Sequence, residues 1–250
     1  MTIQWLYLVN VILISRLPVL FRDRKVPWRL VIATVLFQEA ALLVFKWTVS
    51  TCLLALGLAL LAVIWWRFEE SDSRLVAKRL LVLAGYLTIT AWLCARRFAP
   101  GFSPQLSQLL EVAGDYFVLA ELNVSDPMKL NLYLLGTLLC LNEGNLLVRY
   151  IIQTLDLRPK EVGHHKADPI EYNRGRVIGL LERLTLFTLV AGGQFAAIGF
   201  IIAAKAMARF KRMEEQDFGE YFLVGTLASL VVAGGFALLI QHLVAAQTSR

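Results

Sequence analysis

Long apolar runs, separated by short polar loops, dominate the pattern of side chains along this chain. A helix needs about 20 apolar residues to cross a bilayer, so each run is predicted to form a membrane span. The predicted spans cover 3–21, 30–47, 52–66, 80–95, 130–152, 177–208 and 221–244. The pattern predicts an all-α protein, a polytopic transmembrane helix bundle of about seven spans, within a range of six to eight.

The stretch between the fourth and fifth runs has a different periodicity. Leu106, Leu109, Leu110 and Phe117 recur at helical spacing, and Ser103 followed by proline is a good helix start. We expect an amphipathic helix near 104–121 that lies at the membrane interface. An ordinary surface helix is the alternative.

Basic residues flank the apolar runs and predict the orientation of the chain. The loops 22–29 and 67–79 are rich in Arg and Lys, so the positive-inside rule predicts that both are cytoplasmic and that the N-terminus lies outside. The polar segment 153–176 is predicted to be a third cytoplasmic loop, and in the scaffold alternative given below it docks a cytoplasmic protein partner. Its His164 and His165 do not have the spacing of a metal site.

The sixth run conflicts with this rule. Seven simple crossings place the basic cluster at 205–212 outside, although cytoplasmic ends should carry most of the Lys and Arg. In one alternative, Gly192 and Gly193 break the run into a short helical hairpin with both basic ends on the cytoplasmic side. In another, Val177–Arg183 lies at the interface and the span begins later. Seven crossings are the first expectation.

Composition supports a membrane location and excludes several classes of protein. Hydrophobic residues make up 58% of the 250 residues, charged residues 18%, and mean hydropathy is +0.62. Soluble domains are less apolar and more charged. The net charge of +6 fits loops that contact anionic headgroups, and no direct binding of nucleic acid is expected. Three cysteines within apolar runs indicate neither a disulfide framework nor a metal site, and no cofactor or catalytic motif is present.

The polar residues within the runs divide the chain into two parts. Residues 1–129 are predicted to form an N-terminal membrane layer of about four spans plus the interfacial helix. Residues 130–250 form a C-terminal membrane half that carries the intramembrane polar groups, and both belong to one integrated domain. Ionisable side chains at membrane depth are rare and are functional candidates.

Three groups of such residues stand out in the C-terminal half. The first surrounds Glu143, the second is the adjacent pair Glu182 and Arg183, and the third follows the Gly-Gly pair. Together they predict a substrate or ion path formed by Glu143, Asn145, Arg149, Glu182, Arg183, Gln194, Lys205, Arg209 and Glu220. The alternative for each group is a hydrogen-bonded or charged helix contact that holds the bundle together.

Partners for the charges also follow from geometry. Because adjacent residues point apart on a helix, Glu182 and Arg183 should pair with other elements, as in Glu143 with Arg183 or Glu182 with Arg149. Small residues should allow close helix packing. The predicted packing positions are Gly175, Gly179, Gly192, Gly193 and Gly225.

The C-terminal half resembles an uncharacterised family of bacterial multi-pass membrane proteins, a domain of unknown function. The resemblance covers under half of the chain. The matching runs are NEGNLLVRYIIQTL, GRVIGLLERL, GQFAAIGFIIAAKAMARF and EYFLVGTLASL. The resemblance implies a multi-pass protein of the bacterial inner membrane and supplies no activity. The matching runs contain most of the charged residues that are predicted above to form the path.

Three functions fit these observations. The first is passage, by an oligomeric channel or a transporter-like protein, of an ion or small solute along the polar residues of the last spans. The second is a membrane scaffold or signalling subunit that docks its cytoplasmic partner through 153–176. A homo-oligomer is compatible with this function as well. The third is a membrane enzyme that acts on lipid headgroups, with Glu143 or Glu182 as base; no catalytic signature supports it. Passage is the leading hypothesis.

Overall fold

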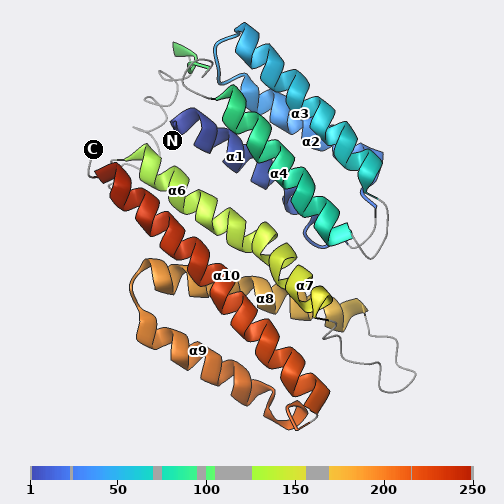
Figure 1. The fold of residues 1–250 in the computed structure, drawn as a ribbon, viewed down its shortest axis with the longest axis vertical. Helices are drawn as coiled ribbons and strands as arrows, with labels where there is room; N and C mark the ends of the chain where they lie inside the picture. The colour runs from blue at the N-terminus through green and yellow to red at the C-terminus, as the bar shows by residue number, and fades with distance from the viewer. Residues whose placement is uncertain are drawn as a thin grey trace. The chain divides into compact units, whose positions relative to one another are not determined.

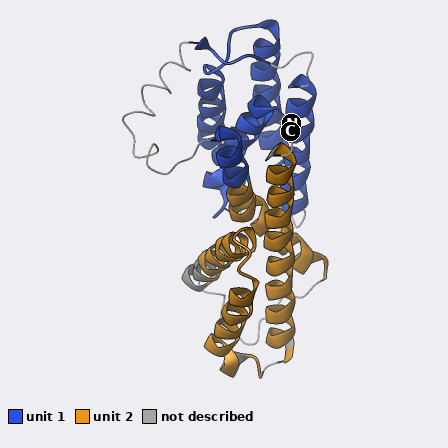
Figure 2. Ribbon diagram, turned by 90° about the vertical axis from the view of Figure 1, so that its left-hand side faces the viewer, with its two compact units in different colours: residues 1–135 blue, residues 136–250 orange. Residues whose placement is uncertain are grey.

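The structure is a computed structural model of the chain, and it describes residues 2–22, 25–69, 75–94, 100–104, 126–155, 169–214 and 216–248. These residues form helices and turns, with one isolated β-bridge between Phe45 and Phe102. The all-α prediction is confirmed. Two compact units divide the chain, residues 1–135 and 136–250 (Figure 2). The predicted boundary lies at residue 129, a few positions earlier.

Three of the described helices are long and apolar enough to cross a membrane. They are α3 (Val49–Phe68), α4 (Leu75–Leu93) and the segment Phe218–Gln247 of α10 (Gln216–Thr248). Shorter apolar helices cover Ile3–Val19 and Phe195–Ala208. The structure therefore supports a helical membrane protein, while the full set of seven spans stays a prediction.

Helices α1 (Ile3–Arg16), α2 (Trp28–Leu42), α3 and α4 pack together in the described part of the first unit (Figure 1). Helix α1 packs against α2 and α4, and α3 packs against the same two helices. The short helix η1 (Leu17–Val19) follows α1. Large apolar side chains occupy the interior positions, where they pack closely and leave few voids between the helices. Leu8, Ile12, Leu54, Leu58 and Tyr86 are buried there together.

The other described helices belong to the second unit, except for the first part of α6, because the boundary between the units falls after Leu135 (Figure 1). Helix α6 (Pro127–Leu138) continues into a π-helical turn, η3 (Leu139–Glu143), and then into α7 (Gly144–Thr154). Helices α8 (Pro169–Ala191) and α9 (Phe195–Ala208) follow, and the short helix η4 (Phe210–Arg212) precedes α10. Within this unit α10 packs along α8 and α7, and α9 contacts α8.

The expectation of one continuous helix over 177–208 is wrong. Helix α8 ends at Ala191, and Gly193 has a positive φ of 70°, a conformation that favours glycine because it has no Cβ. Helix α9 then returns beside α8, and the ion pair between Glu182 and Lys205 closes the two arms. The chain therefore forms the helical hairpin of the alternative hypothesis.

Apolar side chains cover much of the outside of both units. Leu60 and Val63 of α3 are 54% and 58% exposed, and Phe200 of α9 is 74% exposed. Helix α9 has no buried residue at all. Water-exposed helices of soluble proteins carry polar groups on such faces, so these surfaces suit lipid tails.

Two predicted features fall outside the described residues. The amphipathic helix near 104–121 lies almost wholly within 105–125, and the centre of the 153–176 loop, including His164 and His165, lies within 156–168.

Candidate functional site

A π-helical turn lies at the centre of the second unit, where α6 passes into α7. The N–H of Gly144 donates to the carbonyl of Leu139, five residues back, instead of to Cys140, four residues back. The Cys140 carbonyl accepts a hydrogen bond of 3.1 Å from Nε of Arg183. Such single π-turns recur at functional positions in proteins.

Arg183 reaches this turn from α8. Its terminal nitrogen also donates to Oδ1 of Asn145 at 3.3 Å, and only 2% of Arg183 is exposed. Gly144 makes room for the side chain, since a Cβ at that position would lie 3.4 Å from Cδ of Arg183 and 3.2 Å from the Leu139 carbonyl oxygen. A guanidinium is thus held within an apolar unit by oxygen atoms of one turn.

Glu143 completes the polar cluster. It is 2% exposed, and Nδ2 of Asn142 donates to its Oε1 at 2.9 Å. We call Asn142, Glu143, Asn145 and Arg183 the π-turn centre; each is at least nine-tenths buried. Burial of an acid and a base costs free energy unless both groups have polar partners. The π-turn supplies such partners from its backbone and from the side chains of Asn142 and the adjoining Asn145.

The hairpin brings a second pair of predicted residues together. Nζ of Lys205 lies 2.7 and 2.6 Å from the two carboxylate oxygens of Glu182, and 5.2 Å from the ring centre of Phe222 on α10. Lys205 is thus the partner that the structure shows for Glu182, while the expected pairing of Glu182 with Arg149 stays a prediction. Glu182 and Arg183 do take partners on different elements. Arg149 itself is half-buried on α7 and lies outside the π-turn centre.

The turn of the hairpin depends on a residue that the sequence did not single out. Nε2 of Gln241 on α10 donates to the carbonyls of Val190 and Ala191 at 3.1 and 3.0 Å. These carbonyls belong to the last turn of α8, where few helical donors remain, and the Val190 carbonyl also accepts from the N–H of Gly193 at 3.0 Å. Gln194, which was predicted to matter here, is exposed, and its backbone N–H donates to the Leu189 carbonyl at 2.8 Å.

The remaining candidates lie away from the π-turn centre. Arg209 is half-buried at the end of α9. Glu220 is exposed on α10 and accepts a hydrogen bond of 3.0 Å from Gln216. The charge pattern alone does not distinguish these surface positions from the buried ones.

The predicted glycine contacts are mostly absent among the described residues. A Cβ at Gly175 would meet no described atom within 4 Å, so the described residues give no support for close helix packing there. A Cβ at Gly179 would contact a nitrogen of Arg183, and one at Gly192 would contact atoms of its own turn. A Cβ at Gly225 would make an ordinary contact with Ile152. The tight approach is instead at Gly136, where a Cβ would overlap the ring of Phe187 and touch Ile240.

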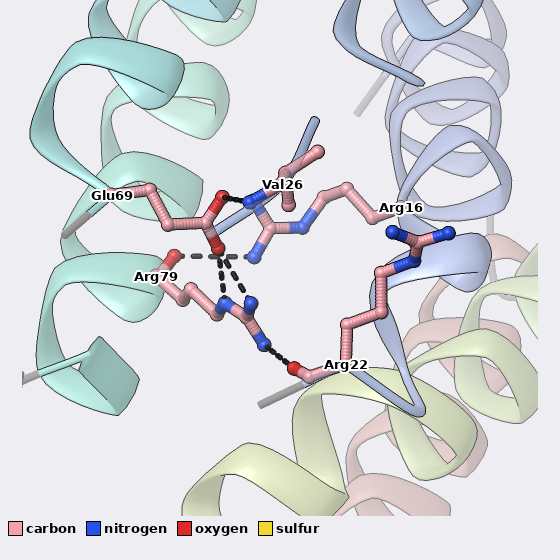
Figure 3. Close-up of polar contacts among 5 residues, drawn as sticks. All are labelled: Arg16, Arg22, Val26, Glu69 and Arg79. Atoms are coloured by element: carbon pink, nitrogen blue, oxygen red, sulfur yellow. Dashed lines mark hydrogen bonds and ion pairs between the residues drawn. The ribbon is translucent and has the colours of Figure 1, made fainter. Parts of the chain in front are cut away.

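Sequence analysis also missed a buried network in the first unit (Figure 3). Arg79 of α4 forms an ion pair of 2.6 Å with Glu69, and its Nη1 donates to the Arg22 carbonyl at 2.8 Å. Glu69 also accepts from the backbone N–H of Val26, and Arg16 donates to the Arg79 carbonyl. Glu69 and Arg79 lie in the polar segment 67–79, and nothing in its sequence indicates that these two charges are buried.

No protein-family model, no curated protein and no solved structure matches the chain. Within the described ranges, no three His, Cys, Asp or Glu side chains lie close enough to bind a metal ion together.

Proposed function

We propose that this chain is an integral membrane protein of the channel or transporter class, through which an ion or small solute passes by way of the second unit. One observation carries the proposal. The π-turn centre places Glu143 and Arg183 inside a helical unit whose outer surface is apolar. Ionisable groups at such depth usually line a path or bind what moves along it.

The broken helices around the centre support this function. Helix interruptions at membrane depth are tolerated where protein or water satisfies the freed backbone groups, and transporters use them to bind ions and solutes. Here the Cys140 carbonyl of the π-turn binds Arg183, and the ion pair of Glu182 with Lys205 joins the two arms of the α8–α9 hairpin. Gln241 satisfies the carbonyls at the hairpin's turn.

The hairpin also suggests how the chain threads the bilayer. We propose seven membrane elements: α1, α2, α3, α4, the α6–α7 helix, the α8–α9 hairpin and α10. A hairpin with both ends on the cytoplasmic side removes the conflict with the positive-inside rule for the basic residues at 205–212. The N-terminus and the C-terminus then both lie outside, and the resemblance of the C-terminal half suggests a bacterial inner membrane. A homo-oligomer fits a channel of this size.

A scaffold or signalling subunit is the second candidate function. Its support is the closed pair of Glu182 and Lys205, in which both carboxylate oxygens bind the ammonium group. A pair of this kind holds helices together and leaves neither charge for a moving solute. The unburied apolar α9 offers a surface for other membrane helices.

The test is a flux assay on the purified protein in liposomes. Vesicles loaded with a pH-sensitive or a potassium-sensitive dye report passage of H⁺ or K⁺, and light scattering after an osmotic step reports glycerol. Vesicles with the wild-type protein should equilibrate at least one of these probes faster than protein-free vesicles. The Glu143→Gln variant should lose that passage, because it removes the buried charge while keeping size and one hydrogen-bond acceptor.

Glu214→Gln is the matched control. Glu214 is an exposed acid in the turn before α10, so its variant should pass the probe at the wild-type rate. Equal rates for wild-type and Glu143→Gln vesicles contradict the site. Wild-type rates equal to those of protein-free vesicles for all three probes favour the scaffold function instead.

A further inference from the structure

One end of the first unit carries exposed cations beside exposed tryptophans. Nζ of Lys25 lies 5.0 Å from the ring centre of Trp66, and the guanidinium carbon of Arg29 lies 5.7 Å from that of Trp28. Trp28 and Trp66 are 58% and 37% exposed. We call this surface the cationic rim; it consists of Arg22, Lys25, Trp28, Arg29, Trp66 and Arg67, all exposed.

The buried network of Figure 3 holds the rim in place. Glu69 accepts a hydrogen bond of 3.3 Å from the N–H of Val26, and Arg79 donates to the Arg22 carbonyl. The backbone on both sides of Lys25 is therefore tied to the α3–α4 end of the bundle. Glu69 is itself 1% exposed and paired with Arg79, so its charge does not neutralise the cations at the surface.

The wall next to the rim is apolar. Val63 and Ile64 precede Trp66 on α3 and are 58% and 44% exposed, and Ile32 follows Arg29 on α2 at 47%. A surface with exposed aliphatic residues, then tryptophan, then Lys and Arg reproduces the order of tails, interface and headgroups in a bilayer. An acidic soluble protein would match the cations but would leave the aliphatic wall in water.

We propose that the cationic rim is a binding site for the headgroup phosphate of an anionic phospholipid. The cations attract the negative headgroup, the indole rings lie at the interface, and the acyl chains cover the aliphatic wall. The proposal rests on the membrane location assumed above and is independent of the π-turn centre, so it can fail while the flux result stands.

The experiment is native mass spectrometry of the full-length protein in neutral detergent, titrated with phosphatidylglycerol or with phosphatidylcholine. The wild-type protein should bind its first phosphatidylglycerol more tightly than phosphatidylcholine. The double variant Lys25→Gln, Arg29→Gln should weaken that first dissociation constant by about fivefold for each cation removed. Both side chains are exposed, so the variant should keep the wild-type melting temperature.

Lys46→Gln is the matched control, because Lys46 is also exposed and also has an exposed tryptophan neighbour, Trp47, but lies between α2 and α3 at the other end of the two helices. Phosphatidylglycerol binding should be unchanged in this variant. Equal binding of the two lipids to wild-type protein, or equal loss in the control and the double variant, overturns the proposal. Displacement of the lipid by millimolar inorganic phosphate also overturns it, since the site would then bind free phosphate.

Discussion

Replacing Arg79 by methionine should destabilise the first unit more than a typical point substitution does. Arg79 forms the 2.6 Å ion pair with Glu69, and it also donates to the Arg22 carbonyl at 2.8 Å. Glu69 is 1% exposed, so Arg79→Met leaves a carboxylate in the interior with only the Val26 N–H as a recorded donor. Breaking a buried pair on one side costs about 3–5 kcal/mol.

Two companion variants separate the ion pair from simple loss of packing. Arg79→Lys keeps the charge but offers one compact ammonium group in place of the planar fork, so the loss should be smaller, about 1–3 kcal/mol. The double variant Glu69→Leu, Arg79→Met removes both charges and should be more stable than Arg79→Met alone, because no unpaired carboxylate stays buried.

The assay is equilibrium unfolding in mixed micelles, followed by circular dichroism and by the melting temperature of the detergent-solubilised protein. The reasoning predicts the order wild type, Arg79→Lys, Arg79→Met from most to least stable, with the double variant above Arg79→Met. A loss below about 1 kcal/mol for Arg79→Met, which is the range of exposed pairs, would refute a buried pair. A double variant no more stable than Arg79→Met would refute the proposed cause.

Three further predictions concern the second unit. Gly136→Val should lower the melting temperature by overpacking against Phe187 and Ile240, at a cost of about 1–3 kcal/mol or more, whereas Gly175→Val should have little effect. Gln241→Leu should destabilise the hairpin by about 1–3 kcal/mol because the Ala191 carbonyl loses its side-chain donor and the Val190 carbonyl keeps only the N–H of Gly193, and faster proteolysis near Gly193 would report it. Lys205→Met should be destabilising, and the double variant with Glu182→Leu should restore part of the loss in the same melting assay. Wild-type melting temperatures for Gly136→Val, or no recovery in the Lys205 double variant, would contradict the described contacts.

Hydropathy predicts the helical class of this chain because burial of apolar surface in lipid requires long apolar segments. It could not choose between one helix and a hairpin over 177–208. That choice depends on local backbone geometry at Gly193 and on a distant donor, Gln241, whose contact with the end of α8 exists only after the helices pack. The Gly-Gly pair was the available signal, and it indicated the hairpin only as an alternative.

The candidate site was partly predictable for a similar reason. Glu143, Asn145 and Arg183 stand out as polar residues in apolar runs; the structure buries all three, binds Arg183 to Asn145 and places Glu143 in the π-helical turn. The π-turn that organises them is not visible in the sequence, because it is defined by backbone hydrogen bonds, such as that from Gly144 to Leu139, which no side-chain pattern marks. Glu69 and Arg79 were missed because burial of a loop-flanking charge depends on the tertiary fold, and Glu220 was included although it is exposed.

The π-turn centre is the central claim of this account, and an experimental structure of the protein in lipid nanodiscs tests it most directly. The account predicts ordered water or a bound solute next to Glu143 and Arg183, in a polar path that reaches at least one face of the membrane. A dry π-turn centre, sealed by side chains on every side, would contradict passage and would make these residues a contact that holds the helices together.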